Sequence, residues 1–73
     1  MIVNDYFIGN GTSTWYMLTH YTVDPNRVAV SVDGAELYYG HNFVINGNQY
    51  LGFIDKPVEG SQIHAEYEGT PYE

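Results

Sequence analysis

Three histidines are the side chains in this sequence that could bind a transition metal, because neutral imidazole is a common ligand of zinc and copper. They are His20, His41 and His64. No two of them have the His-x-x-x-His spacing that brings two ligands to one face of a helix. They fall on an expected loop, an expected turn and an outward strand position. We interpret them as isolated solvated side chains and predict no metal site and no cofactor.

Carboxylates are the next candidates, since paired acids hydrolyse glycosides and clustered acids bind calcium. The acids considered for calcium are Asp24, Asp33, Glu36, Asp55 and Glu59. They form no Asp-x-Asp-x-Asp-Gly run, and Asp33 and Asp55 have the context of turn residues. A chain of 73 residues also has little room for a substrate cleft. We therefore expect these carboxylates to be structural or solvated.

No residue has the sequence context of a catalytic nucleophile either. Ser13, Ser31 and Ser61 lack the Gly-x-Ser-x-Gly context of a nucleophile elbow. The chain has no cysteine, which removes thiolate catalysis, thiolate zinc sites and a disulfide-stabilised secreted scaffold. We predict that the protein is not an enzyme and has no catalytic residues.

The charge balance excludes further classes of function. The formal net charge is −7, and Arg27 and Lys56 are the only basic residues. Nucleic-acid binding requires a cationic face, and anionic membranes attract basic segments, so neither partner is expected. No stretch approaches the roughly 20 apolar residues of a membrane-spanning helix. No basic n-region of a signal peptide is visible, so we expect a complete, soluble protein made in a cytoplasm.

The most informative feature of the composition is its many aromatic residues: eight tyrosines, three phenylalanines and one tryptophan. If Trp15 and Met17 face the interior of a strand pair, the period of two turns their neighbours outward. The outward positions given by this alternation are Tyr6, Tyr16, Leu18, Val44 and Tyr50. A soluble monomer seldom exposes a large contiguous apolar patch, and tyrosine is enriched in interface hot spots. We predict that these five residues bind a partner.

The outward residues must be positioned by β-strands. Residues 27–34 are the clearest, because Val28, Val30 and Val32 alternate with small or polar residues before an Asp-Gly turn. We expect the other strands to pack around this central strand. Seven strands are expected, over residues 6–8, 14–18, 28–32, 35–39, 42–45, 49–54 and 62–67. The sequence therefore predicts an all-β fold, a small antiparallel β-sandwich or partly open barrel.

One domain over residues 1–73 is expected, with its core within about residues 6–67 and a short C-terminal tail over 68–73. The predicted core is Phe7, Trp15, Met17, Val28, Val30, Val32, Leu37, Phe43, Ile45, Leu51, Phe53, Ile63 and Tyr67. A domain of this size buries only about 60% of its unfolded surface, so its stability is marginal. Such a core favours help from a partner, and we expect a homo-oligomer or a multi-copy assembly.

Turns and strands together form an ordered set of motifs. They are Phe7-x-Gly9-Asn10-Gly11-Thr12-x-Thr14-Trp15-x-Met17, Val28-x-Val30-x-Val32-Asp33-Gly34, Gly40-x-Asn42-Phe43-x-Ile45-x-Gly47, Leu51-x-Phe53, Pro57-x-x-Gly60 and Ile63-x-Ala65-x-Tyr67. This set resembles the small β-sandwich module of tailed-bacteriophage virion proteins, above all tail fibres and other appendages. The module usually lies inside a long fibre polypeptide, whereas here it spans nearly the whole chain. The resemblance implies a virion protein without catalytic residues.

The resemblance and the outward aromatic residues together predict a non-enzymatic structural protein. The reading that we favour is a capsid decoration (cement) subunit, made in the host cytoplasm, that docks on other virion proteins through an aromatic sheet face. A tail or fibre-attachment subunit is the alternative within this class. A carbohydrate-binding host-recognition module is the competing class, with Tyr38 and Tyr39 near His41 and Asn42 as its candidate site. On the favoured reading, Tyr16→Asp prevents incorporation into particles without unfolding the protein.

Overall fold

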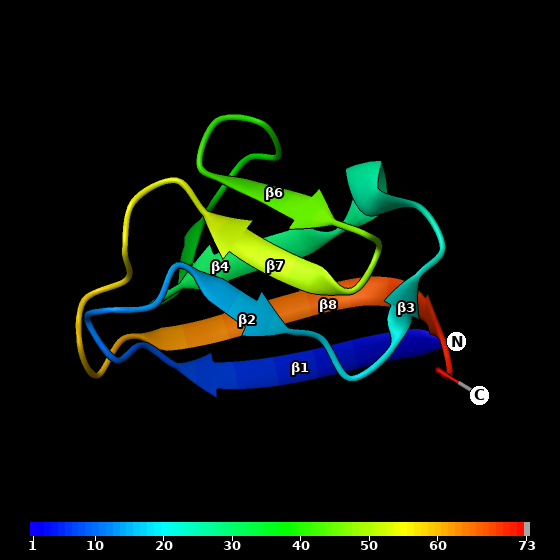
Figure 1. Cartoon of the computed structure of the whole chain (residues 1–73), viewed down its shortest axis with the longest axis horizontal. Helices are drawn as coiled ribbons and strands as arrows, with labels where there is room; N and C mark the ends of the chain where they lie inside the picture. The colour runs from blue at the N-terminus through cyan, green and yellow to red at the C-terminus, as the bar shows by residue number, and fades with distance from the viewer. Residues whose placement is uncertain (73) are drawn as a thin grey trace.

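The protein folds as an open β-sandwich of eight strands in two antiparallel sheets, in a computed structural model that describes residues 1–72. This confirms the predicted all-β class. The strands are β1 (Ile2–Ile8), β2 (Trp15–Met17), β3 (Tyr21–Thr22), β4 (Ala29–Val32), β5 (Ala35–Glu36), β6 (Phe43–Asn46), β7 (Tyr50–Phe53) and β8 (Gln62–Thr70). A 3-10 helix, η1 (Pro25–Arg27), joins β3 to β4. Figure 1 shows the two sheets lying across one another.

β8 is the central strand of the larger, five-stranded sheet, whose order is β1-β8-β4-β5 with β3 also on β8. β8 therefore pairs with three strands, and its last residues pair with β3 through Tyr21↔Thr70. The predicted central strand, β4, pairs only with β8 and β5. The sheet is thus organised around the last strand of the chain. Residues 68–70, predicted as tail, belong to that strand.

The smaller sheet has the order β2-β7-β6. β6 and β7 form a hairpin whose turn uses positive φ values at Gly47 and Asn48. Two bonds beyond β2 extend its pairing with the hairpin, because Leu18 N donates to Gln49 O and Phe53 N donates to Thr14 O, each at 2.8 Å. The register puts Trp15, Gly52 and Val44 side by side across the three strands.

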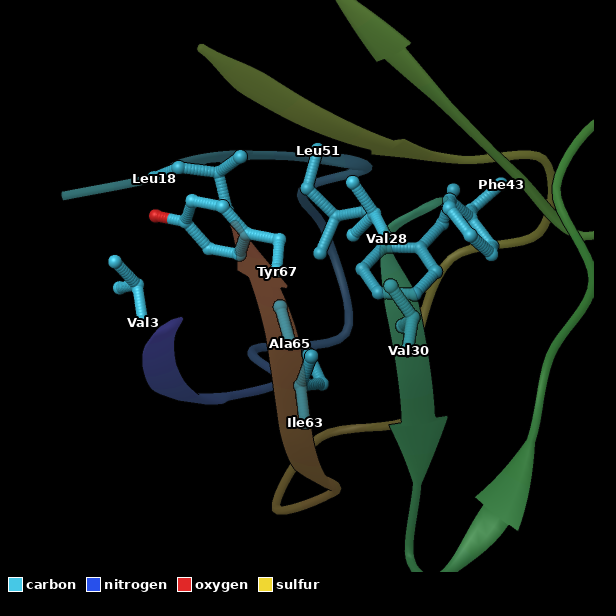
Figure 2. Packing of buried hydrophobic residues seen from close by; sticks show 10 residues of the cluster. Val3, Leu18, Val28, Val30, Phe43, Leu51, Ile63, Ala65 and Tyr67 are labelled. Carbon is cyan, nitrogen blue, oxygen red and sulfur yellow. The ribbon is translucent and has the colours of Figure 1, made fainter. Parts of the chain in front are cut away.

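The core lies between the two sheets and contains most of the predicted residues (Figure 2). Its buried residues are Val3, Leu18, Val28, Val30, Phe43, Leu51, Phe53, Ile63, Ala65 and Tyr67. Phe7, Tyr16, Val32, Leu37 and Ile45 are partly buried against it. Figure 2 shows Leu18 beside the ring of Tyr67.

The facing of β2 was predicted wrongly. Trp15 and Met17, expected in the core, are 49% and 50% exposed, whereas Leu18 is 1% exposed and Tyr16 is half-buried. Tyr16 faces inward, where its ring lies 5.5 Å from Phe7 and 5.7 Å from Phe53 between centroids. The segment is apolar at every position, so burial of either face removes apolar surface from water and the local pattern does not choose between them.

Candidate interaction surface

The outward surface of the smaller sheet carries no charged side chain, because β2, β6 and β7 contain none. Its outward residues form two rows across the strands, Trp15–Gly52–Val44 and Met17–Tyr50–Asn46. Tyr50 is 41% exposed, and Trp15 and Met17 are about half exposed. We call the surface formed by these six residues the Trp15 face. It is a largely apolar surface on a protein whose net charge is −7.

Gly52 explains how the indole of Trp15 fits on this surface. A Cβ at Gly52 would lie 2.6 Å from Trp15 Cε3, so a side chain there would collide with the ring. The indole therefore covers the backbone of the neighbouring strand, and Gly52 is buried beneath it. An aromatic residue lying across a strand glycine restores the packing that the glycine lacks. The ring is thus held flat with half of its surface open to solvent.

The predicted partner-binding residues do not share one surface. Val44 and Tyr50 lie on the Trp15 face. Tyr16 and Leu18 point into the core, so the prediction that they face outward is wrong. Tyr6 is exposed, but it lies on β1 in the other sheet.

Sequence reasoning missed Trp15 and Met17, which are the most exposed large side chains of β2. The signal that was available is Gly52. A glycine inside an otherwise apolar strand indicates that another group approaches its backbone closely. The pairing of β7 with β2 places that glycine opposite Trp15, whose indole fills the space.

The outward surface of the larger sheet is acidic by contrast. On β8, Glu66 and Glu68 point outward beside Asn4 and Ile2 of β1. Tyr6 stacks on His64, with ring centroids 4.7 Å apart and planes at 13°, and His64 Nε2 lies 2.8 Å from Asn4 Oδ1. The protein therefore presents one uncharged sheet surface and one acidic sheet surface.

Asp5 is the buried carboxylate that most resembles a catalytic group. Its oxygens accept hydrogen bonds from Thr19 N at 3.0 Å, from Thr19 Oγ1 at 2.6 Å and from Tyr67 Oη at 2.6 Å. Burial alone raises its pKa, but the hydrogen bonds from Thr19 and Tyr67 outweigh burial, and the pKa is lowered. Burial, followed by the bond to Asp5, raises the pKa of Tyr67 to about 12. These bonds tie β1 and β8 to the β2–β3 loop, which is a structural role.

The histidines do not come together. His20 Nδ1 lies 2.8 Å from Thr19 Oγ1, and His64 stacks on Tyr6. Within residues 1–72, no three His, Cys, Asp or Glu side chains are grouped to hold a metal ion. The same residues include no helix long and apolar enough to cross a membrane.

The candidate sugar site does come together in the β5–β6 loop. Asn42 Oδ1 accepts a hydrogen bond from Tyr38 N at 3.2 Å, and Gly40 adopts a positive φ of 84°. Tyr38 is 63% exposed, whereas Tyr39 packs its ring edge against Phe43. Tyr38 is therefore the more open of the two rings, and the amide oxygen of Asn42 is already used within the loop.

No family model matches this chain, and comparison with curated proteins and with solved structures gives no significant match.

Proposed function

We propose that this protein is a non-enzymatic structural subunit of a tailed-bacteriophage particle, and within that class a capsid decoration (cement) subunit. It docks on neighbouring virion proteins by burying the Trp15 face. The observation that carries the docking role is the combination of half-exposed Trp15, Met17 and Tyr50 on a sheet without a charged residue. The ordered turn-and-strand motifs, which resemble the phage module, support the particle context.

The size of the Trp15 face indicates how it docks. The exposed parts of its large side chains amount to roughly 300 Å², which is well below the ~800 Å² that a standard interface takes from each partner. Its burial gives roughly 7 kcal/mol, against an association cost of about 4–15 kcal/mol. One such contact is weak, so the subunit docks together with other contacts in a repeated lattice, where linked contacts reinforce one another.

A substitution at Met17 tests this proposal. Met17→Asp places a charge on the Trp15 face at a half-exposed position of β2, where we expect the variant to fold. We expect at least about a tenfold loss of copies bound to particles that lack the protein, because a buried unpaired carboxylate costs several kcal/mol. Quantitative gel densitometry of sedimented particles measures the copies.

Val58→Asp is the matched control, since Val58 is 75% exposed and lies on the β7–β8 connection, away from the Trp15 face. It should bind particles like the unmodified protein. Full occupancy by Met17→Asp would overturn the docking surface. The copy number at saturation distinguishes a subunit of the capsid from a subunit of the tail, because the number follows the symmetry of the structure to which the protein binds.

The exposed ring of Tyr38 beside Asn42 favours carbohydrate binding as the second candidate function. An aromatic ring beside a polar side chain can stack on one face of a sugar while hydrogen bonds fix its orientation. A glycan array with the isolated protein tests it. Specific binding that is lost in Tyr38→Ala supports this function, and an array without a specific signal excludes it.

A further inference from the structure

β1 is the long open edge of the larger sheet. The sheet order puts β1 and β5 at its two edges, and β5 has two residues whereas β1 has seven. Natural sheets protect their edges with short strands, with Lys or Pro, with bulges, or with inward-pointing charged residues. The inward-pointing charge of β1 is Asp5, whose oxygens already accept hydrogen bonds from Thr19 and Tyr67. β1, Ile-Val-Asn-Asp-Tyr-Phe-Ile, has neither Lys nor Pro and pairs with β8 without a break. In Figure 1 it forms the lower border of the larger sheet.

The backbone groups on this edge can be assigned by residue. Gly69 N donates to Met1 O at 2.7 Å and Gly9 N donates to Ser61 O at 2.8 Å, so the odd-numbered residues of β1 bond to β8. The N–H and C=O groups of the even-numbered residues then point away from the sheet; these residues are Ile2, Asn4, Tyr6 and Ile8. Within residues 1–72, no backbone group pairs with them.

The side chains of the same residues leave the edge accessible. Ile2 is 62% exposed, Tyr6 is 73% exposed and Ile8 is 65% exposed, all on the outward surface of the sheet. A row of unpaired backbone groups beside exposed apolar side chains is the arrangement that accepts an added strand from another chain.

A second copy of this protein is a poor occupant of the edge. Each copy carries a net charge of −7. The antiparallel self-pairing that uses all four outward residues of both copies places Ile2 opposite Ile8 and Asp5 opposite Asp5 of the second copy. Like charges placed directly opposite in a strand pair destabilise it. Asp5 already accepts its hydrogen bonds from Thr19 and Tyr67, so it gains no partner there.

A basic strand is the complementary occupant. Glu66 and Glu68 point outward one strand inside the edge, opposite Asn4 and Ile2. Lys or Arg side chains of an added strand can lay their aliphatic stems over Ile2 and Tyr6 while their charged ends reach these two carboxylates. The N-terminal ammonium of Met1 already pairs with Glu68, so within residues 1–72 Glu66 is the one of the two carboxylates without an ion pair. The basic side chains of the chain are Arg27 and Lys56, and neither lies on β1 or β8.

We propose that β1 is a strand-addition site, where an extended segment of a different protein that alternates β-branched residues with Lys or Arg pairs with the outer edge of Ile2–Ile8. This site is separate from the Trp15 face and does not depend on the proposed function. With both surfaces in use, the protein bridges two neighbours.

A peptide titration of the full-length protein tests the proposal. The probe is the end-blocked peptide Lys-Val-Thr-Val-Lys-Val-Thr-Val-Lys, and its control has Glu in place of Lys. In NMR spectra, the basic peptide should shift the amides of Ile2, Asn4, Tyr6 and Ile8 and slow their hydrogen exchange. The amides of the odd-numbered residues, already bonded to β8, should keep their protection. The acidic peptide should bind at least about tenfold more weakly.

Three variants separate backbone pairing from charge. Asn4→Pro removes one outward N–H group and leaves the hydrogen bonds to β8 intact. Asn4→Ala is its matched control, because it also loses the amide side chain but keeps the N–H group. The proline variant should lose at least about tenfold in affinity, and the alanine variant should lose little. Glu66→Gln combined with Glu68→Gln, at two exposed sites, should abolish the preference for the basic peptide. The ion pair that Glu68 loses with the N-terminus is exposed, so its loss should change stability little.

Three results would overturn the proposal. They are equal binding of both peptides by the unmodified protein, amide shifts confined to residues away from β1, and self-association in sedimentation experiments that protects the β1 amides. Met17→Asp should bind the basic peptide normally, so failure of the Trp15 face and failure of the β1 edge give different results.

Discussion

At the scale of single residues, Asp5 is the clearest case of a charged side chain used for architecture. It is 6% exposed and lies at a core-facing position of β1, between Val3 and Phe7. An uncompensated carboxylate at such a position would be costly. Three hydrogen bonds from Thr19 and Tyr67 replace the lost water. Asp5 thereby fixes the chain at the crossing from the smaller sheet to the larger one.

Asp5→Asn should lower the free energy of unfolding at pH 7 by about 1–3 kcal/mol, because hydrogen bonds to a carboxylate are stronger than those to an amide. The folded-state pKa of Asp5 is lowered, so its contribution is present above the unfolded-state pKa and is lost as pH falls through the folded-state pKa. The difference between the unmodified protein and the variant should therefore shrink below about pH 4. Urea unfolding between pH 3 and pH 7 measures it, and a difference independent of pH would contradict this role.

At the scale of elements, the alternation of inward and outward residues correctly predicted which faces of β4, β6, β7 and β8 are buried. The same alternation gave the wrong face for β2. Val30, Phe43, Leu51 and Ile63 are buried as predicted, and each has at least one polar or small neighbour that marks the other face. The four residues 15–18 are all apolar, so their own pattern does not choose a face. The choice is made by Gly52, thirty-seven positions after Trp15, whose missing side chain leaves room for the indole.

The start of β1 and the end of β8 were absent from the predicted strands for a related reason. β1 begins at Ile2 and β8 continues to Thr70, although residues 2–5 and 68–70 contain Asn, Asp, Glu and Gly. These residues are poor strand formers locally. They are strands because they pair with each other and with β3, and such long-range pairing is invisible in a local pattern.

Tyr16→Asp gives the sharpest test of the facing of β2. The sequence alone predicted a folded variant that fails to dock. The structure instead places the ring between Phe7 and Phe53 inside the sandwich. We now expect a loss of about 3–5 kcal/mol of stability, because the variant leaves a cavity and buries a charge. Met17→Asp, one position later on the outward surface, should cost less than about 1 kcal/mol. Thermal unfolding of both variants measures the contrast, and equal melting temperatures would contradict the assigned facing.

At the scale of the whole molecule, charge is separated between the two outward surfaces. The smaller sheet has no charged residue, whereas the larger sheet carries Glu66, Glu68 and Glu36 on its strands. The two proposed contacts therefore differ from each other in their physical basis. Burial of the Trp15 face is a hydrophobic contact, and strand addition at β1 combines backbone hydrogen bonds with attraction between Glu side chains and a basic strand.

Salt should distinguish the two contacts. Raising NaCl from about 50 mM to about 500 mM shortens the screening length from roughly 14 Å to roughly 4 Å, so attraction between Glu66 or Glu68 and an added basic strand weakens. We expect the affinity of the basic peptide to fall by about tenfold, while binding of the acidic peptide improves as repulsion from the net charge of −7 is screened.

Docking of the Trp15 face should show the opposite trend, because it buries no charge and because salt screens the repulsion between docked copies, each with a net charge of −7. Occupancy of particles at a fixed protein concentration should therefore stay constant or increase over the same salt range. Parallel titrations of peptide and particles with the same protein preparation measure both responses. If particle binding falls with salt as steeply as peptide binding does, the contact with the particle is electrostatic, and the acidic sheet rather than the Trp15 face is the surface that docks.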